Sequence, residues 1–141
     1  GGTSCDACRA GLFGTTVGAT SDDACTGQCV EGMFSTETGR SSAHACHQCP
    51  AGYYTAEKGA TGCQGCGAGK FSSETGQVSK ATCTGRCSPG KYSAELGRSS
   101  NSACQGKCPT GRYSTESGLI NQDECQKCDA GRYSLGKVLV E

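Results

Sequence analysis

The residues of this chain that could do chemistry are its cysteines, which come in seven close pairs. There are 14 Cys among 141 residues, and two or three residues separate the members of each pair. The pairs are Cys5/Cys8, Cys25/Cys29, Cys46/Cys49, Cys63/Cys66, Cys83/Cys87, Cys104/Cys108 and Cys125/Cys128. Closely spaced pairs of this kind serve as disulfide partners, as zinc ligands or as redox-active dithiols.

Zinc and redox chemistry fit the surrounding sequence less well than disulfides do. His44 and His47 add imidazoles beside Cys46 and Cys49, as zinc sites often have. Zinc modules that bind nucleic acid sit among Lys and Arg, whereas this chain has 13 basic and 13 acidic residues and no net charge. A redox-active pair needs a helix N-terminus to lower the pKa of a thiol, and recurrent Gly disfavours helix. We therefore expect disulfides and no metal or other cofactor.

The spacing between the pairs favours one connectivity. The second Cys of a pair and the first Cys of the next pair enclose 16 residues in five of six cases, and 13 in the sixth. The disulfides predicted on this basis are Cys8 with Cys25, Cys29 with Cys46, Cys49 with Cys63, Cys66 with Cys83, Cys87 with Cys104, and Cys108 with Cys125. Cys5 and Cys128 would then pair outside this fragment. A crossed pattern, in which Cys8 would bond Cys29, stays open because spacing alone does not decide connectivity.

Glycine and aromatic residues repeat in the same frame. A Gly lies three residues after the second Cys of each pair, an aromatic follows two residues later, and a second Gly lies ten residues after the Cys in every complete repeat. The aromatics are Phe13, Phe34, Tyr54, Phe71, Tyr92, Tyr113 and Tyr133. Leu, Ile, Val and Phe together number only 14, too few for a conventional core. We therefore predict that each ring packs on a disulfide.

The pattern predicts a small disulfide-rich fold, an elongated tandem array of short β-hairpin fingers with little or no helix. The repeats are 5–25, 25–46, 46–63 (shortened), 63–83, 83–104, 104–125 and a partial seventh, 125–141. An advance of about five residues per repeat would give a length on the order of 100 Å. In such an array, stability is expected to be a sum of nearest-neighbour terms.

This frame resembles the ephrin-receptor-like cysteine-rich repeats, relatives of tumour-necrosis-factor-receptor and EGF-like modules. The run Cys49-Pro50-Ala51-Gly52-Tyr53-Tyr54-Thr55 and the run from Cys108 to Ser114 match it closely, whereas the run from Cys8 to Gly14 departs at its last residue. The resemblance implies an extracellular or cell-surface setting, as in receptors, matrix proteins or flagellar-hair proteins. It implies a spacer or a contact surface and no catalytic residue.

A few side chains outside the frame are candidates for other roles. Asn121, Asp123 and Glu124 resemble the oxygen-rich segment before the first Cys of calcium-binding EGF-like modules, which makes them a calcium candidate. His44 and His47 are expected to be exposed, with no catalytic relay near them. The apolar residues that could form a contact surface are Tyr53, Leu119 and Ile120, and residues 138–140 are expected to start an element that sequence beyond this fragment completes.

Together these features predict a non-enzymatic extracellular structural protein, a rod-like spacer or fibre component. The alternative is a protein-binding ectodomain fragment of a receptor or adhesin. The expected partners are other protein chains, including further copies in a fibre. O-linked glycans are expected on some of the 30 Ser and Thr residues, while neither Asn101 nor Asn121 is in an N-glycan acceptor motif. Zero net charge and the lack of a long apolar run favour neither nucleic acid nor membrane insertion.

Overall fold

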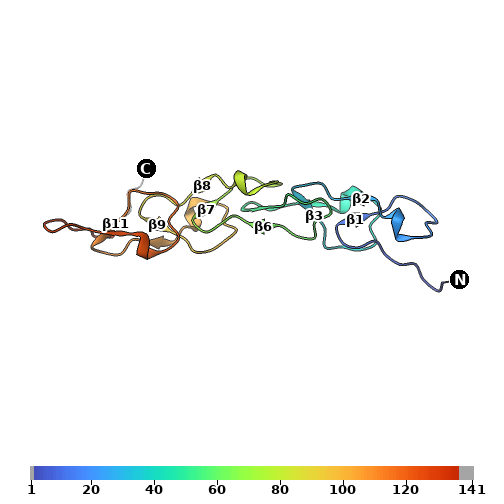
Figure 1. Ribbon diagram of the computed structural model, residues 1–141, viewed down its shortest axis with the longest axis horizontal. Coiled ribbons are helices and arrows are strands. Elements are labelled where there is room, and N and C mark those ends of the chain that lie inside the picture. Colours follow the sequence, from blue (N-terminus) through green and yellow to red (C-terminus); the bar gives the residue numbers. More distant parts are fainter. Residues whose placement is uncertain (1, 137–141) are drawn as a thin grey trace. The chain divides into compact units, whose positions relative to one another are not determined.

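The computed structural model describes residues 2–136, and its regular elements are short hairpins (Figure 1). Each of six two-stranded sheets joins two strands that follow one another in the chain, and the ladders are antiparallel. The strand pairs are β1 (Leu12–Phe13) with β2 (Gly27–Gln28), β3 (Met33–Phe34) with β4 (His47–Gln48), β5 (Tyr53–Tyr54) with β6 (Gln64–Gly65), β7 (Lys70–Phe71) with β8 (Gly85–Arg86), β9 (Lys91–Tyr92) with β10 (Gly106–Lys107), and β11 (Arg112–Tyr113) with β12 (Gln126–Lys127). The predicted array of small disulfide-rich hairpins is therefore confirmed.

A single turn of 3-10 helix precedes the closing Cys in five hairpins. These turns are η1 (Asp22–Ala24), η2 (Ala43–Ala45), η3 (Lys80–Thr82), η4 (Asn101–Ala103) and η5 (Gln122–Glu124), and no α-helix occurs within residues 2–136. The shortened repeat closed by Cys63 has no such turn. Its loop is three residues shorter than the others, which is the length of one 3-10 turn.

The chain divides into two compact units, each with three disulfides. Unit 1 contains the described residues up to Pro50 together with Tyr54–Gln64 and Thr75–Ser79. Unit 2 contains Ala51–Tyr53, Gly65–Glu74 and the described residues from Lys80 onward. In both units the same backbone contacts recur from repeat to repeat.

Three kinds of backbone hydrogen bond connect a repeat to the next within a unit. In the first kind, the first Gly donates its N–H to the carbonyl of the residue after the next repeat's aromatic, as from Gly69 to Ser93 (2.9 Å). The residue after the aromatic donates its N–H to the carbonyl that follows the second Gly of the next repeat, as from Ser35 to Ala60 (3.1 Å) and from Ser93 to Leu119 (3.1 Å). That second Gly donates its own N–H back to the preceding repeat's second Cys. This bond recurs as Gly39 to Cys8, Gly59 to Cys29, Gly76 to Cys49, Gly97 to Cys66 and Gly118 to Cys87, at 2.7–2.9 Å. Adjacent repeats are thus joined through main chain, independently of side-chain identity.

The first Gly of a repeat approaches the repeat after the next. Gly69 has φ +73°, and a side chain there would overlap the carbonyl oxygen of Gly118, two repeats further along the chain. Gly32 has the same relation to Gly76 in unit 1. Two independent reasons therefore favour Gly at this position. A positive φ disfavours residues with a side chain, and the neighbouring backbone fills the space that a Cβ would occupy. Backbone contacts thus reach the second neighbour, and the expectation that stability is a sum of nearest-neighbour terms stays a prediction.

The buried interior consists mainly of cystine and small hydroxyl side chains. Cys29, Cys49, Cys66 and Cys87 have 0–1% of their surface exposed. Ser35, Thr55, Ser72 and Ser93 are the buried polar residues. With so little aliphatic surface to bury, covalent closure and hydrogen bonding carry much of the stability that a core normally supplies.

Candidate functional site

Six disulfides close the hairpins. The bonds are Cys8–Cys25, Cys29–Cys46, Cys49–Cys63, Cys66–Cys83, Cys87–Cys104 and Cys108–Cys125. Their Cα–Cα separations of 5.6–5.9 Å lie in the usual range for disulfides. Each bond joins the second Cys of one pair to the first Cys of the next, so Cys8 bonds Cys25 and not Cys29. The twelve bonded sulfurs are not available as thiolates for redox or metal chemistry.

The two remaining cysteines are free. Cys5 is exposed and Cys128 is partly buried, and their pairing outside this segment stays a prediction. Across residues 2–136, no group of three or more His, Cys, Asp and Glu side chains is arranged to hold a metal ion. His44 and His47 are both exposed. His47 pairs with Phe34 across the β3–β4 hairpin, with 6.2 Å between the ring centroids.

Six of the frame aromatics lie in hairpin strands, whereas Tyr133 lies in none. In three of these hairpins the residue opposite the aromatic is a Gly, and any side chain at that Gly would overlap the ring. These facing pairs are Phe13 with Gly27, Phe71 with Gly85, and Tyr92 with Gly106. Tyr113 and Tyr133 are 42% and 83% exposed, while the other frame aromatics are half-buried. Packing of the rings on the disulfide sulfurs stays a prediction.

A hydroxyl residue follows six of the seven frame aromatics and has a structural role that sequence reasoning missed; Phe13 is followed by Gly14 instead. The hydroxyl accepts a hydrogen bond from the backbone N–H two residues further on, which stabilises the turn. The bonds run from Glu37 to Ser35, Glu57 to Thr55, Glu74 to Ser72, Glu95 to Ser93, Glu116 to Ser114 and Gly136 to Ser134, at 3.0–3.4 Å. The signal was visible, because Ser or Thr recurs at this one position. A generic solvating role does not explain that regularity.

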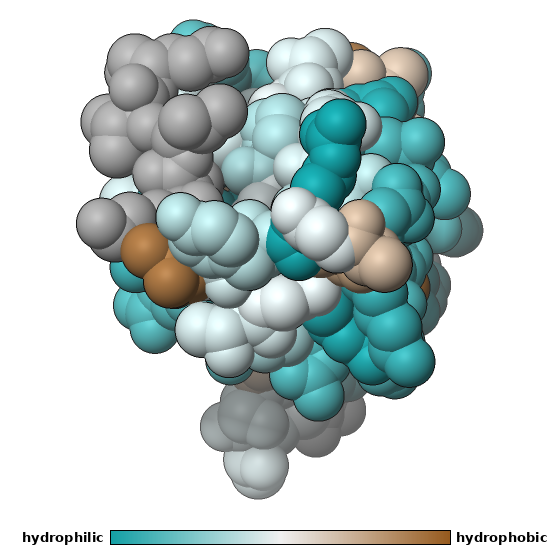
Figure 2. Space-filling view, turned by 90° about the vertical axis from the view of Figure 1, so that its left-hand side faces the viewer, coloured by the Kyte–Doolittle hydropathy of each residue, from teal (hydrophilic) through white to brown (hydrophobic). Residues whose placement is uncertain are grey.

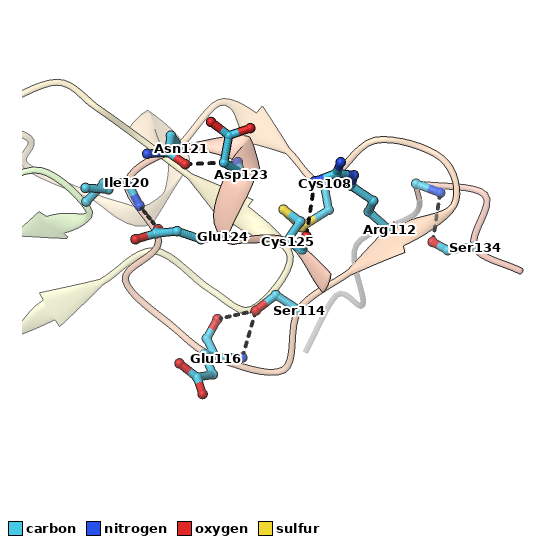
Figure 3. The surroundings of a disulfide bond; sticks show 11 residues. Cys108, Arg112, Ser114, Glu116, Ile120, Asn121, Asp123, Glu124, Cys125 and Ser134 are labelled. Atoms are coloured by element: carbon cyan, nitrogen blue, oxygen red, sulfur yellow. Dashed lines mark hydrogen bonds between the residues drawn. A yellow bond between two sulfur atoms is a disulfide. The ribbon is translucent and has the colours of Figure 1, made fainter. Parts of the chain in front are cut away.

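The calcium candidate Asn121, Asp123 and Glu124 lies on the exposed η5 turn (Figure 3). The Asn121 Oδ1 accepts a hydrogen bond from the Asp123 N–H at 2.9 Å, which caps the turn. Glu124 Oε2 accepts one from the Ile120 N–H at 2.7 Å. Two of the three candidate ligands thus stabilise the local backbone, and calcium binding here stays a prediction.

The apolar contact candidates do not form one surface. Leu119 is only 6% exposed and packs with Cys108, Cys125 and Tyr92, so the expectation that it is a contact residue is wrong. Its backbone pairs with Tyr92 of the preceding repeat, which turns its side chain inward. Ile120 is 40% exposed, and residues 138–140 lie outside the described part of the chain. The end of the molecule in Figure 2 is largely hydrophilic, with small separate apolar spots.

Tyr53, the aromatic outside the frame, is partly buried. Its ring occupies the space beside Gly97, where a side chain would meet it. Both residues belong to unit 2. Tyr53 thus packs against the turn of another repeat, and part of its ring surface is not available to a partner.

A hollow of about 250 Å³ lies in unit 1 and is lined by residues 39–42 together with His44 and Ala45. Arg40 is in an ion pair with Glu37 at 2.7 Å. The residues that line the hollow include no carboxylate, thiol or second imidazole that could join His44 in a relay.

These features define a class: small all-β proteins built from tandem disulfide-closed hairpins. Within it, residues 36–83 match the family model described as tyrosine-protein kinase ephrin type A/B receptor-like. The resemblance to this family of cysteine-rich repeats is thereby confirmed. No curated protein matches the chain significantly.

The match and the disulfides agree on the setting of the chain. Disulfide-rich small modules are typical of extracellular and cell-surface proteins, and the matched family is of receptor type. Over the described residues, the structure contains no helix with the length and apolarity needed to cross a bilayer. The matched family is not a catalytic one.

Proposed function

We propose that this chain is a non-enzymatic extracellular spacer, rod-like in form, that holds other modules apart or assembles into fibres. The observation that supports this proposal is the recurrence of one backbone connection from each repeat to the next, described above for both units. Such a connection needs no particular surface side chain, so repeats can be added without altering the link. A structure of this kind is suited to setting length rather than to forming a pocket.

The exposed hydroxyls would carry O-linked glycans in this proposal. Ser35 and Thr55 are 2% and 6% exposed and hold turns, so they are excluded as acceptors. Thr36 and Thr38 of the same arm are exposed and are the expected kind of acceptor. A glycan coat would stiffen the chain and limit proteolysis.

Small-angle X-ray scattering of the oxidised protein tests the rod. An array on the order of 100 Å long has a radius of gyration of about 29 Å for a thin rod, whereas a compact domain of this length has about 14 Å. A value near the compact limit would refute the spacer. Intact mass before and after reduction and alkylation, with hexose-sized mass steps, tests the disulfide and glycan parts separately.

A second function, a protein-binding ectodomain fragment of a receptor or adhesin, is favoured by the family match over residues 36–83. Sedimentation over a wide concentration range distinguishes it from a fibre component. Lateral self-association supports the fibre. A chain that stays monomeric at high concentration and binds a soluble extracellular protein tightly supports the receptor fragment.

A further inference from the structure

The zero net charge of the chain conceals an uneven distribution. Residues 1–66 contain three Lys and Arg against six Asp and Glu, and residues 67–141 contain ten against seven. The excess of positive charge therefore lies in the C-terminal half. Its local field is stronger than the total charge of the chain indicates.

Six of these basic residues face one another in pairs across the three hairpins of unit 2. The cross-strand partners are Lys70 with Arg86, Lys91 with Lys107, and Arg112 with Lys127. Directly opposite residues point to the same face of a hairpin, with Cβ atoms about 5 Å apart. We call them the basic pairs. One pair occurs per repeat, at intervals of 21 residues along β7, β9 and β11.

Within residues 2–136, no carboxylate forms a salt bridge with the basic pairs. Among the described residues of unit 2, Arg98 forms a salt bridge with Glu95. None of the six basic-pair residues forms a salt bridge with a described residue. Arg112 donates a hydrogen bond of 3.4 Å to the Cys125 carbonyl, an uncharged group (Figure 3). One member of each pair, Arg86, Lys107 or Lys127, is exposed, and its partner is partly buried.

The fold does not require positive charge at these positions. In unit 1 the equivalent cross-strand pairs are Leu12 with Gln28 and Met33 with Gln48, which close the same kind of hairpin without charge. Like charges directly opposite each other destabilise a hairpin. Three consecutive repeats keep an unfavourable arrangement that two earlier repeats lack, and a bound anion would offset that cost.

We propose that the basic pairs bind a linear sulfated polysaccharide. Two cations on one face suit a sulfate group, whose oxygens accept several charge-assisted hydrogen bonds. Repetition at a fixed interval suits a polymer that carries anionic groups along its length. The choice of a polysaccharide over a nucleic acid rests on the extracellular setting in the proposed function. The competing occupant is the acidic half of a second copy of this chain.

Binding of the oxidised protein to immobilised heparin, measured from 50 to 200 mM NaCl, tests the proposal. If all six cations release counterions as they do on a polyphosphate, affinity should fall about 10³-fold over this range. Lys91→Gln/Lys107→Gln removes one basic pair and should lower the slope of log affinity against log salt by about 2. Lys58→Gln/Lys80→Gln removes two charges outside the basic pairs and serves as the matched control.

The slopes of the two variants decide between the proposal and its alternatives. A loss of slope in the Lys91/Lys107 variant but not in the control, together with no binding to unsulfated dextran, supports the proposal. Equal slopes for both variants, or no binding by the unmodified protein, overturn it. Sedimentation at low salt gives the other arm: salt-sensitive dimers that the Lys91/Lys107 variant abolishes would assign the surface to a second copy instead. Scattering of the same samples tests the spacer independently of heparin binding.

Discussion

Replacing Gly69 by Ala should be far more damaging than the same change at Gly111. Both residues are the first Gly of their repeats and have positive φ, +73° and +79°. Both donate to the next repeat, to Ser93 and Ser134, at 2.9 Å. They differ in one respect. A Cβ at Gly69 would overlap the carbonyl of Gly118, whereas a Cβ at Gly111 would meet no atom of the described residues within 4 Å.

The magnitudes follow from these two contributions. A left-handed conformation costs an L residue about 1–2 kcal/mol, and this applies to both variants. Forcing an extra carbon into packed structure costs about 1–3 kcal/mol more, and this applies only to Gly69→Ala. The free energy of opening should therefore fall by about 2–5 kcal/mol in Gly69→Ala and by about 1–2 kcal/mol in Gly111→Ala.

Native-state amide hydrogen exchange gives matched reporters for the two variants. The Cys87 N–H donates to the Gly69 carbonyl at 2.9 Å, and the Cys128 N–H donates to the Gly111 carbonyl at 3.0 Å. Amide exchange at Cys87 in Gly69→Ala should be accelerated about 5- to 150-fold more than amide exchange at Cys128 in Gly111→Ala. Equal losses in the two variants would show that repeats two apart are not energetically coupled, which would refute the argument from packing.

Three further changes test other parts of the structure by the same exchange measurement. Ser72→Ala removes a buried hydroxyl and should cost about 1 kcal/mol, whereas Ser73→Ala on the exposed side of the same turn should stay within about 0.5 kcal/mol; equal losses would contradict the turn role. Lys91→Gln removes one charge from a basic pair and should stabilise its hairpin by about 0.2–1 kcal/mol at low salt, a gain that high salt should erase. Leu119→Ala should cost about 2–5 kcal/mol, and the control Leu96→Ala, 63% exposed, should be close to neutral.

The disulfide frame could be predicted because it depends on the spacing of residues that are close in sequence. A loop of constant length between successive pairs indicated closure, and a Gly at a fixed distance after Cys indicated a turn. Gly39 and Gly97, for example, do have positive φ. These features depend on residues close in sequence, which is where spacing is informative.

What the sequence did not reveal depends on contacts between distant residues. Lys70 and Arg86 lie 16 positions apart, and only the strand register places them opposite each other. Leu119 was a candidate contact residue because it forms a short apolar segment with Ile120, but it is paired with another repeat and buried. No pattern in the sequence indicates that Gly69 approaches Gly118. The short 3-10 turns lack the periodicity that identifies longer helices.

The closed loops also determine how the chain responds to tension. Each 17-residue separation between bonded cysteines, such as Cys66 and Cys83, is bridged over a Cα–Cα distance of only 5.7 Å. The same stretch, fully extended after reduction, would span roughly 60 Å. A pulling force on the oxidised chain therefore bypasses the loops and acts on the few residues between consecutive bonds. Reduction of a disulfide would release the contour length of its loop, so the extensibility of the chain would depend on how many of the bonds are reduced.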